Sequence, residues 1–599
     1  MTITQGATMT RAPRVLSCDE VCSFLENMGE DDVVACDTEG TNIDWDYRDG
    51  RGFGTGISLA FRFGELLTGY YPIGHPSENL TDEEVYRLRN ALRNFKGWLV
   101  FHNSKHDLVA LRTLGIDYKG KFYDTMLLCH LLNETLPYTK SLNSCVAHYL
   151  GEGFAKDDAE VKAVVAALNG EWHKVPAKIM APYAIHDAVL TLFLFEKIET
   201  RIFKEMPREY WDHKQDFIRV IVAMESRGVR VNVDLCKHMT AIGEVQLAEV
   251  VELLGLNPGS PKDQYELFVE RLGLPILEKK RSKKTGKPSF DKEVMEYYEE
   301  ILERKNDPTA ELFLTYRGWQ KAVSSNYKPY VALLSPDGRL RPNYKLHGTK
   351  TGRMSCEKPN LQQIPRVSNK PWNGRMKECF IPADGYTLWE FDYSQLEFRL
   401  GTAYAAQYQP DIPLVGIFAD PTRDVFTEMS KLEGWPRQDI KTRTYTVQFG
   451  GGAQRLSDVF NVSLEEGARI RDGFFSMYPG FNQVTKMAKS KAKGRGKLQL
   501  WSGRYRHFMF PESEAHKAFN AVIQGGAADI MNHVMVRLFQ EVDDDVECRM
   551  LLQVHDSVVF EIKNGCEDEY LPRIKQVMED VRPDFGVVFR VDGHKWGEG

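Results

Sequence analysis

Residues 549–562 read RMLLQVHDSVVFEI, in which two apolar runs flank the pair His555-Asp556. Each run has the length and composition of a β-strand, so the stretch predicts a hairpin with a two-residue turn. Such turns normally use Asn-Gly or Asp-Gly, because both central positions need a positive φ. His-Asp breaks this rule, and a broken local rule is typical of a functional site. The alternative interpretation is a slightly irregular hairpin.

A second predicted strand also ends in an acid. Residues 388–395 read LWEFDYSQ, with Asp392 near the strand end. From Arg341 onward the chain begins with strands, continues through a long helical stretch and ends with strands. This order predicts a helix-rich insertion between two halves of one sheet.

Residues 437–450, RQDIKTRTYTVQFG, predict a helix within that insertion. Arg437, Lys441, Tyr445 and Phe449 recur every four residues and therefore form one stripe. The rise from Arg437 to Tyr445 is ~12 Å, near the length of an extended triphosphate plus sugar. Two cations followed by an aromatic ring would suit a nucleotide lying along the helix. The alternative is a solvated basic face with a buried aromatic end.

The N-terminal third carries another group of acids. Asp37 and Glu39 end the apolar run VVA, and residues two apart share one face of a strand. Two carboxylates on one face repel each other unless a cation, usually a divalent metal, lies between them. Residues 103–107 (NSKHD) place an acid at the start of a helix, and residues 183–187 (YAIHD) place a phenol and an acid on one helical face. Each motif taken singly has a plainer interpretation. Asp37 and Glu39 could be exposed strand-end acids, NSKHD a helix cap and YAIHD an ordinary surface pair.

Composition bounds the class of protein. The 599 residues include Lys+Arg 77 and Asp+Glu 84, a net charge of −7, so net charge does not decide nucleic-acid binding. No run of about 18 apolar residues and no apolar signal core occur, which predicts no membrane span and no secretion. The 10 Cys lack any CxxC pattern. Reduced thiols in a cytoplasm, the host's if the source is viral, are therefore expected.

The first group of acids resembles the DnaQ-like 3′–5′ exonuclease family. The match is carried by Asp37-x-Glu39, by Asn103-x-Lys105-x-Asp107 and by Tyr183-x3-Asp187. The resemblance implies an RNase H-like domain in which two divalent ions are held by the four acids and Tyr183 orients the attacking water. Its substrate would be a frayed single-stranded 3′ end.

The second group resembles the polymerase motifs of family A DNA polymerases, and this resemblance covers nearly the whole chain. It implies a right-hand polymerase with thumb, palm and fingers and an antiparallel palm sheet. In that family two Mg²⁺ ions, with Mn²⁺ as the alternative, would be held by Asp392, Asp556 and the backbone oxygen of Tyr393. Lys441 would act on the leaving group, and Glu397 would be the steric gate against ribose. The implied nucleotide contacts are Arg437, Lys441, Tyr445, Phe449, Glu397 and Tyr393, and the implied DNA contacts are Arg353, Asn360, Gln362, Arg375, His516, Asn520, Gln524 and His555.

The resemblance has departures. Ser557 stands where the family usually has Glu, Phe426 stands where many relatives have His, and Tyr445 stands where many have Phe. The first removes a neighbouring carboxylate, the second puts one phosphate contact in doubt, and the third implies weak discrimination against dideoxynucleotides. The basic loop Lys279 to Lys287 reads equally well as a thumb tip that binds duplex phosphates or as a solvated loop.

The predicted organisation is a multidomain α/β protein. The expected domains are an exonuclease at 1–205, a thumb with connecting helices at 206–340, palm at 341–404 and 546–599, and fingers with adjoining helices at 405–545. No 5′-nuclease domain precedes residue 14, which favours a bacteriophage-type replicative enzyme. We expect a monomer that binds primer–template DNA and dNTPs, without a membrane, and that works with a helicase, primase or single-strand-binding protein.

Two other functions fit parts of the pattern. A single-subunit RNA polymerase also resembles the His-Asp-Ser motif and the tyrosine on the nucleotide helix. Glu397 and the preceding exonuclease set oppose that assignment. A nuclease whose C-terminal half only binds DNA is opposed by the presence of Asp392, Asp556 and Lys441 together.

Overall fold

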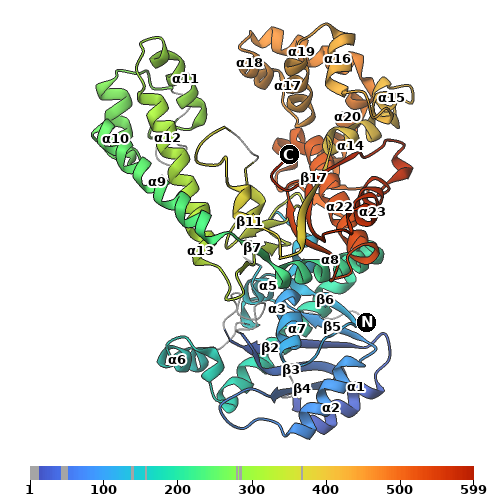
Figure 1. Ribbon diagram of the computed structural model, residues 1–599. Helices are drawn as coiled ribbons and strands as arrows, with labels where there is room; N and C mark the ends of the chain where they lie inside the picture. Colours follow the sequence, from blue (N-terminus) through green and yellow to red (C-terminus); the bar gives the residue numbers. More distant parts are fainter. Residues whose placement is uncertain are drawn as a thin grey trace. The chain divides into compact units, whose positions relative to one another are not determined.

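The computed structural model divides into two compact units, whose helices and strands are labelled in Figure 1. The first comprises Met1–Arg227, Tyr344–Ser355 and Phe391–Gly593, and the second comprises Gly228–Asn343, Cys356–Glu390 and His594–Gly599. The structure describes residues 13–41, 52–136, 140–154, 158–277, 281, 286–365 and 369–598. The first unit includes α8 (Arg208–Arg227), and the second includes part of the predicted palm, so the predicted domain boundaries stay a prediction.

The N-terminal part of the first unit is built on a mixed sheet. β2 pairs antiparallel with β3 and parallel with β5, and β3, β4 and α2 lie between β2 and β5 along the chain. The strand order is β1 (Arg14–Val15), β4 (Glu65–Pro72), β3 (Gly54–Phe63), β2 (Val33–Gly40), β5 (Trp98–Phe101) and β6 (Lys121–Asp124).

Helices cover this sheet, as expected for an α/β layer. The helix α7, at Ala177–Glu205, packs against β2, β3 and β4. In the part of the chain that is described, it is the helix long and apolar enough to cross a membrane, but half of its apolar window is buried inside the protein. The other helices here are α1 (Cys18–Asn27), α2 (Asp82–Arg93), α3 (Ser104–Thr113), α4 (Thr125–Leu132), α5 (Leu142–Tyr149) and α6 (Ala159–Ala167).

The C-terminal sheet confirms the predicted hairpin and the helical insertion. Its strand order is β15 (Cys548–Val554), β16 (Ser557–Lys563), β12 (Tyr386–Tyr393) and β17 (Val591–Lys595). β15 and β16 are antiparallel and are joined by His555 and Asp556 alone. Only His555 of these two has a positive φ, 55°, the sign pattern of a type II′ rather than a type I′ turn.

Helices fill the segment between β12 and β15. Many large rings form their core, including Phe398, Phe426, Phe474, Phe481 and Phe519. The helices named below are α14 (Leu396–Ala406), α16 (Val425–Glu433), α17 (Arg437–Gln448), α20 (Pro479–Arg495) and α22 (Ala518–Glu541). The predicted helix at 437–450 is therefore confirmed.

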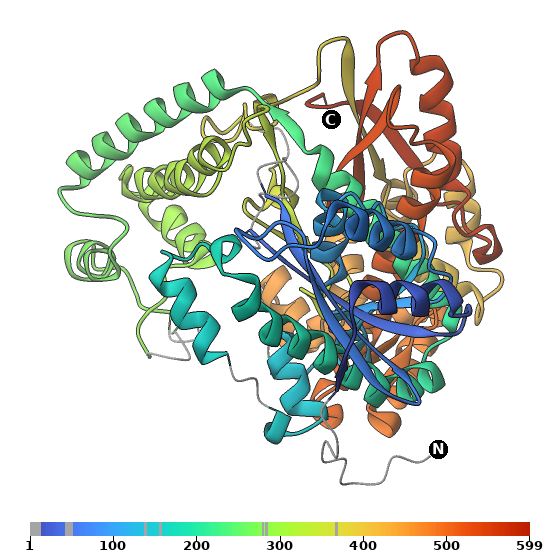
Figure 2. The ribbon, with the colours of Figure 1, turned by 90° about the horizontal axis from the view of Figure 1, so that it is seen from below.

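The second unit is mostly helical, as the sequence predicts. α9 (Val233–Leu254), drawn lengthwise in Figure 2, packs against α12 (Thr309–Ala322). α11 (Lys292–Glu303) shares their core, which contains Phe268, Tyr298 and Phe313. A small sheet has the order β11 (Phe380–Ile381), β7 (Val229–Val231) and β8 (Arg339–Leu340). Most of the basic loop Lys279 to Lys287 lies outside the described residues.

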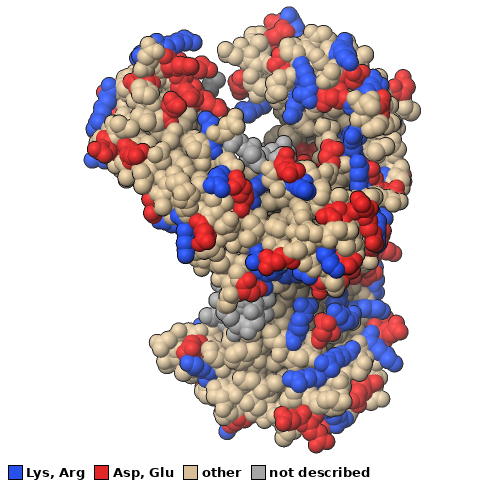
Figure 3. All heavy atoms as spheres, in the orientation of Figure 1, with Lys and Arg blue, Asp and Glu red and all other residues tan. Residues whose placement is uncertain are grey.

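Charges of both signs are interspersed over the face drawn in Figure 3. This mixture agrees with the near balance of 77 basic and 84 acidic residues. Overall charge therefore does not mark the functional surface.

Candidate active sites

Three of the four predicted exonuclease acids lie together. Ligand atoms of Asp37, Glu39 and Asp187 all lie within 4.8 Å of one another, and each residue is partly buried. Asp37 and Glu39 share a face because they are two apart on β2, and α7 brings Asp187 to that face. Three carboxylates this close provide the hard oxygen ligands that divalent cations prefer.

Asp107 lies beside this group but outside it. Its side chain is 1% exposed and accepts hydrogen bonds from Thr38, at 3.1 Å from the backbone N and 2.8 Å from Oγ1. Burial raises the pKa of Asp107 to about 8, although the Thr38 hydrogen bonds oppose this. Its role as a metal ligand therefore stays a prediction.

Tyr183 lies one helical turn before Asp187 on α7, as predicted. Burial raises the pKa of its phenol, and the carboxylates of Asp187, Glu39 and Asp37 raise it further. The hydroxyl therefore keeps its proton at neutral pH and stays a hydrogen-bond donor beside the acids.

The two predicted polymerase acids lie on neighbouring strand ends. Asp392 is on β12, and Asp556 is in the turn that leads into β16, the strand next to β12. The backbone N of Tyr393 donates to the carbonyl O of Asp556 at 3.3 Å, which ties the two strand ends together. The Tyr393 side chain is buried, and its hydroxyl donates to the carbonyl O of Met578 at 2.7 Å. Only the main chain of Tyr393 is therefore oriented to serve the site.

Arg353 joins two acids at this site. Its guanidinium donates to Glu397 at 2.7 Å and to Asp556 at 3.2 Å. Burial raises the pKa of Glu397 and the nearby Asp556 carboxylate adds to this, whereas Arg353 opposes it. Glu397 and Asp556 are therefore close enough to interact, which the sequence motifs do not show.

The predicted nucleotide stripe is present on α17. Arg437 and Lys441 are exposed, and the rings of Tyr445 and Phe449 stack at 5.7 Å. These two rings line an open hollow of about 520 Å³. Burial, with Glu397 and Asp556 nearby, raises the pKa of Tyr445 to about 12. The aromatic end of the stripe therefore lies toward the acids.

The sequence did not predict that Asp424 pairs with Arg437 of the nucleotide stripe. It caps α16 and accepts two hydrogen bonds from Arg437, at 2.8 and 3.0 Å. The guanidinium of Arg437 lowers the pKa of Asp424 to about 2. The capping position before an apolar run was the available signal, but its pairing with a residue on another helix was not visible in the sequence.

Ser557 and Phe426, which depart from the family pattern, make contacts within the fold. The Ser557 hydroxyl is buried and donates to the carbonyl O of Val554 at 2.8 Å, inside the turn. Phe426 is buried, with its ring 5.7 Å from those of Phe398 and Tyr445. Neither side chain is placed to replace the family's acid or histidine.

The predicted DNA contacts occupy both units. His516, Asn520 and Gln524 lie four apart at and within the start of α22, and His555 is exposed at the hairpin turn. In the second unit, the Asn360 side chain accepts from the backbone N of Gln362 at 3.1 Å. Arg375 there forms an ion pair with Glu378 at 2.8 Å. Their roles toward DNA stay predictions.

Comparison with protein families agrees with the two groups of acids. Residues 231–598 match the model described as DNA polymerase family A, and residues 15–202 match the model described as 3′-5′ exonuclease. The chain belongs to DNA polymerase family A. The exonuclease match contains Asp37, Glu39 and Asp187, and the polymerase match contains Asp392 and Asp556.

Relatives of this family A chain include bacterial DNA polymerases I. DNA polymerase I of Pseudomonas aeruginosa is 27% identical, and the match covers 94% of this chain and 62% of that protein. Thermostable DNA polymerase I of Thermus aquaticus is 32% identical over 62% of this chain and 46% of that protein. The chain thus spans about half to three-fifths of the length of these relatives.

A solved structure shares the fold of this family A chain. It is the POL domain of Pol1 from M. smegmatis in complex with DNA primer-template and dNTP, with a TM-score of 0.80 at 21% identity. The match covers 98% of this chain and 99% of that chain. The two family matches confirm an exonuclease domain followed by a polymerase domain, and the shared fold agrees with this multidomain α/β architecture and its antiparallel sheet.

Proposed function

We propose that this chain is a template-directed DNA polymerase that extends a primer with dNTPs and removes mispaired ends with its 3′–5′ exonuclease. Family membership supports the class of reaction. The observation that carries the proposal is the convergence of Asp392 and Asp556, which are far apart in the chain, at adjoining strand ends. Phage replication, a monomeric state and helicase, primase or single-strand-binding partners remain part of the proposal.

At the polymerase site, Asp392 and Asp556 would hold Mg²⁺. Such ions supply activation of the primer 3′-hydroxyl and stabilise the leaving pyrophosphate. The exposed cations Arg437 and Lys441 would bind phosphate oxygens, and Lys441 is the proposed proton donor to the leaving group. Arg437 must exchange its Asp424 partner for phosphate, so nucleotide binding would loosen that pair.

Sugar selection is assigned to Glu397. Its carboxylate is held by Arg353 at 2.7 Å and lies near Tyr445, whose ring would face the sugar. A bulky side chain fixed in this place would leave no room for a ribose 2′-hydroxyl. This arrangement favours dNTPs and opposes the RNA polymerase alternative.

At the exonuclease site, Asp37, Glu39 and Asp187 are the proposed ligands for divalent ions, with Asp107 as the fourth. The protonated Tyr183 hydroxyl would orient the attacking water. The substrate would be a single-stranded 3′ end, bound through its backbone and stacked bases.

The test is a labelled primer–template incubated with and without dNTPs in Mg²⁺. Extension with dNTPs and shortening without them are expected. A preference for rNTPs, or synthesis from a promoter without a primer, would overturn the assignment.

A further inference from the structure

Lys105 lies at the centre of the exonuclease motif NSKHD but contacts other elements. It is in the first turn of α3, which is held in place by Asp124, whose carboxylate accepts from Ser104 N at 2.8 Å and Ser104 Oγ at 2.7 Å. From there Lys105 Nζ reaches Glu225 on α8 at 2.5 Å and the carbonyl O of Tyr344 at 2.6 Å. Lys105 therefore contacts residues outside the predicted exonuclease domain.

Lys105 and Glu225 together clamp one residue. Glu225 accepts from the backbone N of Tyr344 at 2.6 Å, so the ion pair binds both backbone polar groups of Tyr344. The Glu225 side chain is 4% exposed and that of Lys105 14%. A buried, charge-assisted pair of this kind fixes its partner more firmly than a surface pair does.

The Tyr344 side chain in turn binds both backbone polar groups of Gln553, in the β15–β16 hairpin. This side chain is fully buried, and its hydroxyl accepts from the backbone N of Gln553 at 3.2 Å and donates to the carbonyl O of Gln553 at 3.4 Å. The Gln553 amide in turn donates to the carbonyl O of His555. The contacts thus end one residue from Asp556.

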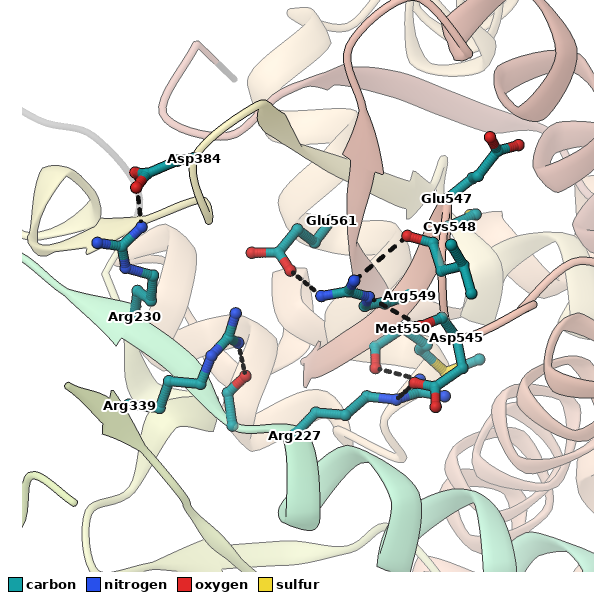
Figure 4. Close-up of polar contacts among 12 residues, drawn as sticks. Arg227, Arg230, Arg339, Asp384, Asp545, Glu547, Cys548, Arg549, Met550 and Glu561 are labelled. Carbon is teal, nitrogen blue, oxygen red and sulfur yellow. Dashed lines mark hydrogen bonds and ion pairs between the residues drawn. The ribbon is translucent and has the colours of Figure 1, made fainter. Parts of the chain in front are cut away.

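The other end of β15 is also held by α8. Arg227 at the end of α8 donates to the carbonyl O of Met550 at 3.1 Å and to Asp545 at 2.9 Å (Figure 4). Arg549 binds Glu561 across the hairpin at 3.3 Å. α8 is therefore linked to β15 at Met550 and, through Tyr344, at Gln553, and the link nearer to Asp556 includes Lys105.

We propose that Lys105, acting through Glu225 and Tyr344, is a positioning residue for the polymerase site. It fixes the position of the β15–β16 turn, and hence of Asp556, relative to Asp392. A displacement of catalytic groups by about 1 Å can cost ~10²-fold in rate, so a lost clamp would lower synthesis without removing any reacting group. This inference rests on the proposed polymerase function of Asp392 and Asp556.

Two variants test it with little change of shape. Tyr344→Phe deletes only the hydroxyl, and Lys105→Met combined with Glu225→Gln replaces the buried ion pair by neutral groups of similar size. Lys119→Met, whose side chain is 74% exposed in the same region of the chain, is the matched control. Each protein is assayed for single-nucleotide primer extension, for degradation of single-stranded DNA and for its thermal unfolding midpoint.

We expect both test variants to lower kcat for extension by ~10-fold with the KM for dNTP nearly unchanged, and Tyr344→Phe to leave the degradation rate nearly unchanged. Combining Tyr344→Phe with the neutral pair should cost no more than the worse of the two, because both act through one contact. Unchanged extension, multiplicative losses, or both activities falling together with the unfolding midpoint would overturn the inference. Absence of extension by the unaltered protein would instead contradict the proposed function.

Discussion

The two groups of acids are assembled in different ways. At the exonuclease site, one strand and one helix bring Asp37, Glu39 and Asp187 within 4.8 Å. At the polymerase site, Asp556 shares Arg353 with Glu397, and the site draws on β12, α14, α17 and the β15–β16 turn. The first geometry is set by one strand–helix contact, whereas the second depends on contacts among several elements.

Removing acids of the exonuclease cluster should have the largest effect. Asp37→Ala combined with Glu39→Ala should lower degradation of single-stranded DNA by at least ~10³-fold, because both are proposed ligands of one metal site. Primer extension by the same protein should persist. Degradation that survives this change would show that the cluster is not the hydrolytic site.

Metal binding without DNA should separate the two sites. Calorimetric titration with Mn²⁺ should show a strong site that is lost in the Asp37→Ala/Glu39→Ala protein and kept in Asp392→Ala, because three adjacent carboxylates bind a cation without help from substrate. Loss of the strong site in Asp392→Ala would reverse the comparison.

Glu397→Ala should weaken sugar selection at the polymerase site. We expect ribonucleotide incorporation to rise by ~10–100-fold relative to dNTPs, because the side chain held by Arg353 would no longer exclude a 2′-hydroxyl. Parallel single-turnover assays with dGTP and GTP measure the ratio. Unchanged selectivity would remove the gate role.

Tyr445→Phe should alter a different sugar position. The phenolic hydroxyl can stand in for a missing 3′-hydroxyl, so its removal should increase discrimination against dideoxynucleotides by ~10-fold. Competition between dTTP and dideoxy-TTP in primer extension measures this. Equal discrimination by both proteins would contradict the role given to the hydroxyl.

Asp107→Asn should change the pH dependence of stability. In metal-free buffer the folded carboxyl keeps its proton up to a pKa of about 8, compared with an ordinary value of 3.8. The unfolded chain therefore binds fewer protons between these values, and stability falls as pH rises through them. Thermal unfolding from pH 5 to 8 should be less pH-dependent in Asp107→Asn. An equally steep slope would show that Asp107 is not the titrating group.

Local patterns predicted much of this architecture. The β15–β16 hairpin follows from two apolar runs that flank a short turn. The stripe on the helix at Arg437–Gln448 follows from a four-residue spacing, and the shared face of Asp37 and Glu39 from a two-residue spacing. The pairings of Arg353 with Glu397 and of Arg437 with Asp424 could not be predicted. They depend on side-chain directions across separate elements, which spacing along one chain does not specify. For the same reason, the orientation of Asp107 toward Thr38 and of Lys105 toward Tyr344 emerged only from the structure.

The most direct test of two separate sites is one gel assay on Asp392→Ala. The protein is incubated with a labelled primer–template in Mg²⁺, with and without dNTPs, beside the Asp37→Ala/Glu39→Ala protein. We predict that Asp392→Ala shortens the primer but never extends it, and that the other variant extends it but never shortens it. Loss of both activities in either folded protein would contradict the account.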